Sequence, residues 1–317
     1  DAKITVKKNL TIEAKCFSVS DAVFCEGDAV LNAEQGMVVF AEVHAKTLDI
    51  HAAYFCQEAP ITVEGQYDIS AQAYQQKASA KTVSNNLRLV ADQCDISGDL
   101  DVKENVFLTA NNLFVAADIE FLGQHHVHVG NCVVKAGSNF SVMPTQKKTA
   151  EKLSNNFTVD NCLFVAENSW LKLKNTKLHA DAVENSGSVS TEGCHVFVNR
   201  MEQNNQLEMQ GSTMTVSDCF VQYGVAQSKF SQVEFNNKAV IIKGGLFLLS
   251  DSEWTGRQAY VYAGGRLGIN DSSDVFLGEL ISFDPEASLS IGASTVAVEN
   301  NMRLYGNAVV DAARIVC

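Results

Sequence analysis

Residues 86–142 read NLRLVADQCDISGDLDVKENVFLTANNLFVAADIEFLGQHHVHVGNCVVKAGSNFSV, and their hydrophobic pattern repeats about every 19 residues. Cys94, Leu113 and Cys132 follow one another at this step. A repeat of roughly twenty residues built from short alternating strands is typical of a solenoid, in which each repeat stacks on the next. The stretch therefore predicts a stack of similar coils.

The second half of the chain carries the same repeat in short strands with period two. Apolar pairs recur once per coil at Leu171/Leu173, Leu207/Met209, Phe247/Leu249, Leu267/Ile269 and Leu289/Ile291. Such alternation places one face of a strand inside and the other outside. Two further strands follow in each coil, so the pattern predicts about three short strands per coil of roughly 19–20 residues. We predict an all-β parallel β-helix in which residues 1–317 form a single β-solenoid.

Two regions depart from the regular repeat. Residues 1–80 contain strand-like runs with looser spacing and are expected to form less regular coils. Residues 144–156 are polar and open with Pro144, and they predict a loop that projects from the solenoid.

Glycines and asparagine pairs mark the expected corners. Gly187, Gly224, Gly245 and Gly265 precede the first strand of a coil. Asparagine pairs recur at 85–86, 111–112, 155–156, 204–205, 236–237 and 300–301. We expect these asparagines to take the left-handed conformation at turns and to stack into side-chain amide ladders.

Composition limits the class of partner. The formal charge is −13, from 37 acidic and 24 basic residues. Binding to a phosphate backbone needs clustered Lys and Arg, so we expect no nucleic acid partner. A run of about 18 apolar residues is missing, so we expect no membrane insertion.

The nine cysteines favour burial over pairing. Cys56, Cys94 and Cys132 are 38 residues apart, or two repeats. Residues two coils apart are separated by about 9.5 Å, which is too far for a disulfide. We interpret the three as small hydrophobic side chains in one core column, a use of cysteine that favours a reducing compartment.

Several segments resemble repeats of filamentous-haemagglutinin-like exoproteins: NLTIEA (9–14), NLRLVA (86–91), FLTANNLFVAA (107–117) and FTVDNCLFVAEN (157–168). The resemblance is to a strand-and-turn pattern across most of the chain. It implies a right-handed β-helical shaft of a bacterial surface or secreted adhesin or toxin-delivery protein. On localisation the resemblance and the cysteine usage therefore point in opposite directions.

The run at 125–128 carries a candidate metal site. Val127 falls under Leu108 in the repeat and should point inwards, so His126 and His128 should both point outwards on one strand face. Two histidines two residues apart are close enough to share a metal ion. The alternative is a solvated outer strand, because no third ligand is assignable.

Two sets of exposed residues are candidates for binding. In the 19-residue register Arg88, Phe107 and His126 form an outward column, which either serves stability as a cation–π stack or belongs to a binding face. Trp170 should point outwards beside an inward leucine. Tyr260 and Tyr262 make one face of their strand aromatic, which is either packing between coils or a sugar- or protein-binding strip.

Many β-helix enzymes act on acidic polysaccharides through two or three carboxylates on one outer face. The outward positions of the first strands hold no such cluster: Lys172, Lys174, Glu208, Gln210, Leu248, Ser250 and Ser290. Asp271, Asp274 and Asp284 fall at turn positions, where Asp is common. We assign no catalytic residue and no cofactor, and lean against an enzyme.

We therefore expect a structural or interaction β-helix, a shaft or surface-presenting module of a larger bacterial secreted, surface or effector protein. The alternatives are a carbohydrate-active β-helix enzyme and a module that binds a glycan or protein ligand. The last coil begins at Val309 and ends without a capping segment after Ile315. A solenoid end of this kind predicts end-to-end self-association or a covering domain.

Overall fold

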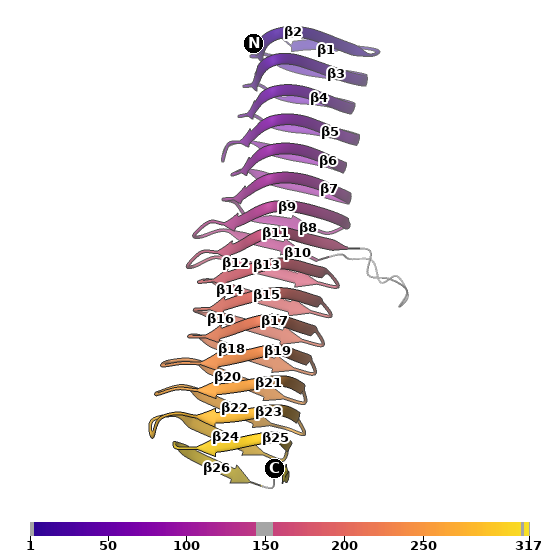
Figure 1. The fold of residues 1–317 in the computed structure, drawn as a ribbon. Coiled ribbons are helices and arrows are strands. Elements are labelled where there is room, and N and C mark those ends of the chain that lie inside the picture. The colour runs from indigo at the N-terminus through magenta and orange to yellow at the C-terminus, as the bar shows by residue number, and fades with distance from the viewer. Residues whose placement is uncertain (1–2, 144–154, 312–313, 317) are drawn as a thin grey trace. The chain divides into compact units, whose positions relative to one another are not determined.

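The computed structural model describes residues 3–143, 155–311 and 314–316. In those ranges all regular secondary structure is β-strand. The strands pair in parallel from coil to coil. This confirms the prediction of an all-β solenoid of stacked coils. Within the same ranges no helix has the length and hydropathy of a membrane span. The chain forms two compact units, residues 1–160 and 161–317, and each is a stack of coils (Figure 1).

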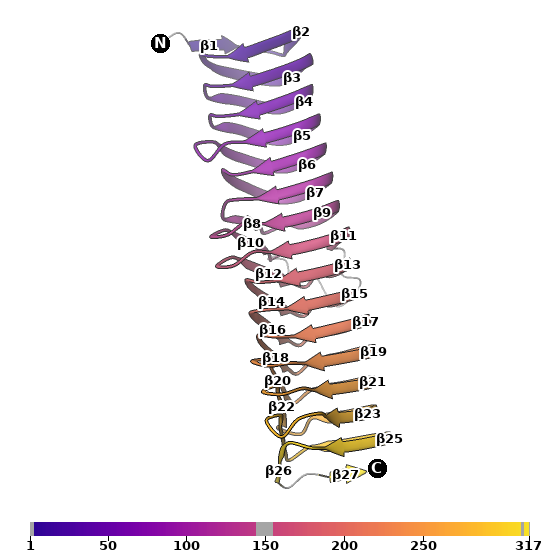
Figure 2. The ribbon, with the colours of Figure 1, turned by 60° about the vertical axis from the view of Figure 1, so that its left-hand side comes forward.

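Unit 1 is built largely from long bent strands, one per coil. Its strands are β1 (Lys3–Val6), β2 (Leu10–Val19), β3 (Ala22–Val39), β4 (Val43–Gln57), β5 (Ile61–Gln76), β6 (Lys81–Ile96), β7 (Asp99–Val115), β8 (Ile119–Phe121), β9 (Gln124–Val134) and β10 (Asn139–Val142), followed by β11 (Asn156–Val165), which ends in unit 2. In Figure 2 the near strands point to the left while the chain descends, so the coils wind right-handedly.

Each long strand consists of three straight segments joined at two corners. In the pairing of β3 with β4 the register shifts between Cys25 and Asp28 and again between Ala33 and Gly36. These shifts are bulges, which bend a strand locally. Three segments per coil match the number that the sequence predicts.

The core of unit 1 follows the predicted inward columns. Leu113 pairs with Cys94 on one side and with Cys132 on the other, and all three side chains are buried. Cys56 is buried too, but the expectation that it shares their column is wrong. It pairs with Gln75, whereas Cys94 pairs with Tyr74. The step from β5 to β6 is 20 residues here and not 19, so Cys56 is displaced by one position and lies on the opposite side of its strand.

A buried polar network lies beside the longer corner at residues 77–80. The Tyr74 hydroxyl donates to Gln57 Oε1 at 3.0 Å, and the Thr82 hydroxyl donates to the same oxygen at 3.1 Å. Gln76 Nε2 donates to Thr82 Oγ1 at 3.2 Å and to the Asp99 carbonyl at 3.0 Å. These bonds give partners to polar groups that burial would otherwise penalise, and they link four successive strands, β4 to β7, across the corner.

Unit 2 breaks each coil into two strands, a short first one and a longer bent one. They are β12 (Trp170–Lys174), β13 (Lys177–Asn185), β14 (Ser188–Glu192), β15 (His195–Gln203), β16 (Gln206–Gln210), β17 (Thr213–Gln222), β18 (Val225–Lys229), β19 (Gln232–Ile241), β20 (Leu246–Ser250), β21 (Glu253–Val261), β22 (Arg266–Asn270), β23 (Asp274–Ser282), β24 (Ser288–Gly292), β25 (Thr295–Leu304), β26 (Asn307–Asp311) and β27 (Arg314–Val316). The predicted inward pairs, such as Leu171/Leu173, are buried throughout.

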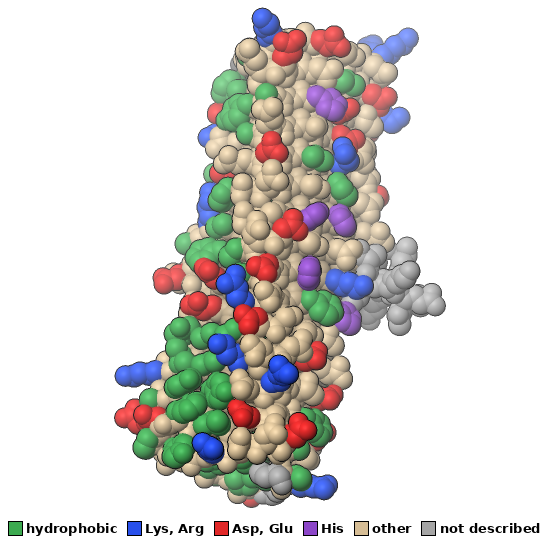
Figure 3. Space-filling view, in the orientation of Figure 1, with side chains coloured by type: hydrophobic (Ala, Val, Ile, Leu, Met, Phe, Trp, Pro, Cys, Tyr) green, Lys and Arg blue, Asp and Glu red, His purple; other side chains and the backbone are tan. Residues whose placement is uncertain are grey.

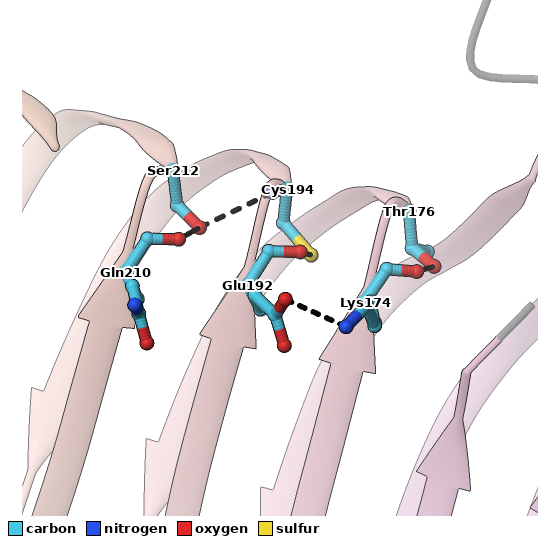
Figure 4. Close-up of polar contacts among 6 residues, drawn as sticks. All are labelled: Lys174, Thr176, Glu192, Cys194, Gln210 and Ser212. Atoms are coloured by element: carbon cyan, nitrogen blue, oxygen red, sulfur yellow. Dashed lines mark hydrogen bonds and ion pairs between the residues drawn. The ribbon is translucent and has the colours of Figure 1, made fainter. Parts of the chain in front are cut away.

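The corner after each first strand of unit 2 is closed by a ladder of small polar side chains. The ladder residues are Thr176, Cys194, Ser212, Ser231, Ser252, Ser273 and Ser294, all buried. Ser212 is representative: its Oγ donates to the Gln210 carbonyl at 3.1 Å and accepts from the Cys194 backbone N–H at 3.1 Å (Figure 4). Ser231 repeats both bonds one coil further on. Such a hydroxyl satisfies a carbonyl of its own coil and an amide of the coil before it.

The residue before each ladder position has a positive φ, which turns the chain through the corner. Gly193 and Gly211 have φ of 61° and 55°, and Asn175, Phe230 and Asp251 have φ of 48°, 51° and 48°. The expectation that the asparagine pairs take this conformation is wrong, because none of them is among the positive-φ residues of the described chain. The predicted amide ladders form only as single contacts, such as Asn131 Nδ2 donating to Asn112 Oδ1 at 3.0 Å, whereas Asn111 and Asn237 donate to the carboxylates of Asp92 and Asp218.

Most of the projecting loop expected at 144–156 lies outside the described residues. Its last two residues are described and belong to the solenoid, because Asn155 is buried and Asn156 begins β11. In the last described coil, β26 pairs with β24 and β27 pairs with β25, and side chains such as Val309 are exposed. A covering domain or end-to-end association at this end stays a prediction.

Replacing cysteine by serine at two buried positions should have opposite effects. In Cys194→Ser a hydroxyl enters the corner ladder, where it donates and accepts more strongly than a thiol, so we expect the free energy of unfolding to rise by about 0.5–1 kcal/mol. In Cys94→Ser a hydroxyl enters a column next to Leu113, so we expect a loss of about 1–3 kcal/mol. Urea unfolding under reducing conditions measures both. Equal destabilisation by the two substitutions would contradict the ladder.

Candidate functional site

The predicted outward column of unit 1 is assembled on the second segments of β6, β7 and β9. Arg88 pairs with Phe107 and Phe107 with His126, and all three side chains are exposed. Arg88 Cζ lies 5.8 Å from the centroid of the Phe107 ring. The Phe107 and His126 rings are 5.3 Å apart and nearly parallel, at 10°. The column is thus a continuous stack of planar groups, each one coil from the next.

A row of amide side chains runs beside this column, and the sequence pattern alone did not reveal it as part of a site. Gln66, Asn86, Asn105 and Gln124 occupy the corner position of four successive coils. Asn105 Nδ2 donates to Asn86 Oδ1 at 2.6 Å. Together with the column, the row lines an open groove of about 430 Å³. The signal that could have found the row is the Asn86 to Asn105 spacing of 19 residues, which is the repeat itself.

The two histidines of the predicted metal site have different partners. His126 stacks on Phe107, whereas His128 Nε2 lies 3.0 Å from both carboxylate oxygens of Asp160. Among the described residues, no group of three His, Cys, Asp or Glu side chains could hold a metal ion. Asp160 was not foreseen because it is 32 residues from His128, across residues 144–154, and the 19-residue step does not lead to it.

His125 points the other way from these two and is buried in an inward column, where it pairs with Val106. Its backbone N–H donates to Asn155 Oδ1 at 3.2 Å. Burial lowers the pKa of the His125 imidazole to about 4, against a raising effect of the Gly123 backbone and a further lowering by His126. The folded chain therefore holds this imidazole neutral near pH 7.

The other predicted binding residues lie in unit 2. Trp170 is exposed as expected, and Lys172 Nζ lies 5.3 Å from the centroid of one of its rings. Tyr260 lies in β21, on the third side of its coil, and Tyr262 lies at the corner that follows β21. Phe283, which no sequence pattern singled out, contacts both, with ring centroids 5.4 Å from Tyr260 and 4.9 Å from Tyr262.

Of the three aspartates considered for an acidic site, Asp271 and Asp284 lie in turns as expected, whereas the expectation of a turn is wrong for Asp274, which lies in a strand. Asp271 has a φ of 54°, and its carbonyl accepts from the Asp251 backbone N–H. Asp284 Oδ1 accepts the Glu286 backbone N–H at 2.9 Å. Asp274 begins β23.

The sequence matches no protein-family model, no curated protein and no solved structure. The resemblance to filamentous-haemagglutinin-like exoproteins accordingly stays a prediction.

Acid should destabilise the fold through His125. The pKa of this side chain is lower in the folded chain than in the unfolded chain, where it is about 6.5. The contribution of neutral His125 to the free energy of unfolding is therefore present above about pH 6.5. It is lost as the pH falls towards about 4, and the total loss at low pH is on the order of 3 kcal/mol. We expect His125→Leu to reduce the loss of stability between about pH 7 and about pH 4.5. Urea unfolding at several pH values measures this, with His179→Leu, at an exposed position on β13, as the control for the loss of a histidine.

Proposed function

We propose that this chain is a non-enzymatic interaction module, a β-helical shaft of a larger bacterial secreted, surface or effector protein. The observation that carries the proposal is the in-register stacking of side chains. Outward-facing residues that are one repeat apart in the sequence lie next to each other on neighbouring coils. They therefore form a straight row on the surface. Arg88, Phe107 and His126 form one such row, and the amides from Gln66 to Gln124 form another beside it.

The groove between these rows supports a glycan as the ligand. Each amide side chain offers both donors and an acceptor, which suits a polymer that presents hydroxyl groups at regular intervals. The exposed edge of the Phe107–His126 stack supplies apolar contact, and Arg88 adds a positive charge that favours acidic sugars. An open groove admits a chain that continues in both directions, as a polysaccharide does.

A carbohydrate-active enzyme is the competing function, and it would use the same kind of ligand. The two differ in whether the bound glycan is altered. Binding through the groove depends on exposed side chains, whose truncation leaves the core columns intact. This allows recognition to be separated from folding.

Phe107→Ala and Arg88→Ala should each weaken glycan binding about tenfold, equivalent to about 1.4 kcal/mol, because each removes one member of the stack. Binding is measured by isothermal titration with neutral, N-acetylated and uronate oligosaccharides. Phe276→Ala, which truncates an exposed phenylalanine of unit 2, serves as the matched control and should bind as the wild type does.

Mass spectrometry of the oligosaccharides after incubation tests the non-enzymatic part of the proposal. Unchanged masses are expected. Shortened or unsaturated products would establish the enzyme instead, and a failure of all three classes of oligosaccharide to bind would reject the glycan ligand.

A further inference from the structure

An exposed apolar strip runs along one corner of unit 2, where the third segment of each coil turns into the first strand of the next. We call it the corner strip, and it consists of Tyr223, Val225, Ile242, Leu246, Tyr262 and Phe283, of which Ile242 and Leu246 are half-buried. Tyr223, Tyr262 and Phe283 are 41%, 41% and 46% exposed. Figure 3 shows hydrophobic side chains gathered over this side of unit 2, at the corners between β19 and β20, β21 and β22, and β23 and β24.

The strip is continuous because its members stack from coil to coil. Tyr223, Ile242, Tyr262 and Phe283 each follow the last paired residue of a third segment, namely Gln222, Ile241, Val261 and Ser282. Val225 pairs directly with Leu246 on the adjoining first strands. A contiguous apolar and aromatic surface of this kind is typical of a protein–protein interface.

The ring geometry favours a protein partner over a sugar. The Tyr262 and Phe283 rings are 4.9 Å apart and close to parallel, at 15°. Each therefore covers a face of the other. The surface that the pair exposes to solvent is broad and apolar. Such a surface is more complementary to an apolar protein surface than to the face of a single sugar ring.

The charges on the strip are ordered along the axis of unit 2. Lys243 lies exposed at the corner one coil before Tyr262, and Glu286 lies exposed at the corner one coil after it. Asp284 shares the corner of Glu286. Arg266 is exposed as well and pairs with Leu246 of the strip, so the strip is basic at Lys243 and Arg266 and acidic one coil further on, at Asp284 and Glu286.

We propose that a second copy of this chain binds the corner strip in antiparallel orientation, about a two-fold axis near Tyr262. This arrangement places Lys243 of each copy opposite Glu286 and Asp284 of the other, whereas parallel packing would oppose like charges. The apolar residues of the two strips meet between these charged ends. The inference goes beyond the glycan groove and does not depend on it, because the groove lies in unit 1.

Charge reversal tests the orientation. Sedimentation velocity across a concentration series should show a monomer–dimer equilibrium for the wild type. Lys243→Glu alone and Glu286→Lys alone should each weaken the dimer about tenfold, since each opposes like charges twice in a two-fold interface. Glu286 is chosen over Asp284 because the Asp284 carboxylate holds its own turn.

Mixing the Lys243→Glu and Glu286→Lys variants should restore association as a heterodimer. In the mixed dimer one of the two symmetric charge pairs carries both substitutions and is complementary in the reversed sense, while the other keeps both original residues. Lys177→Glu, at an exposed position on β13, is the matched control and should not change the wild-type equilibrium. Phe283→Ser should abolish the dimer, with an unchanged circular dichroism spectrum as evidence that the coils persist.

Two results would overturn the proposal. One is a wild type that stays monomeric into the millimolar range. The other is a dimer that neither charge reversal weakens, which would point to association at the ends of the solenoid. Because Phe107→Ala should leave this equilibrium unchanged, failure of the dimer and failure of the glycan groove are separately observable.

Discussion

The parallel pairing of each coil with the next is the constraint on which the rest of this structure depends. A coil can keep its hydrogen bonds to the neighbouring coil only if corners fall at matching positions along the chain. In unit 2 the corner ladder meets this condition. Each small polar residue from Thr176 to Ser294 lies at one corner, and a positive φ just before it turns the chain through that corner. A positive φ costs a non-glycine residue about 1–2 kcal/mol, and the bonds made by the ladder offset that cost.

Unit 1 solves the same problem with bulges in long strands. Its corners do not need a repeated positive φ, and so side chains other than serine occupy them. Where one corner is two residues longer than its neighbours, at 77–80, the network of Tyr74, Gln57 and Thr82 holds the coils in place. Polar side chains inside this part of the solenoid thus mark a change in coil length, which an apolar column could not accommodate without leaving backbone groups unpaired.

The same pairing explains the surface chemistry. Residues at the same position of neighbouring coils are close enough for their side chains to touch. Rings therefore stack on rings, as Phe107 and His126 do, and amides bond to amides, as Asn86 and Asn105 do. Charges arranged along a column acquire a direction, as they do from Lys243 to Glu286. A solenoid thus converts short sequence patterns into extended surfaces, and this is why both proposed contacts involve rows of residues instead of a pocket.

The sequence by itself determined the repeat, the inward columns through Leu113 and Leu171, and the outward facing of Arg88, Phe107 and His126, because period-two alternation reports the facing of each residue within a strand. The sequence also contains the corner ladder, since Ser, Thr or Cys recurs at each corner of unit 2. A single serine has no distinctive local pattern, however, and so the corners could not be predicted from it. Only the tertiary structure decided the position of Cys56, the partnership of His128 with Asp160 and the charge order of the corner strip. These depend on how many residues each corner inserts. A change of one residue there reverses the facing that a fixed 19-residue step would assign to the residues that follow, and no periodicity within a strand can report it.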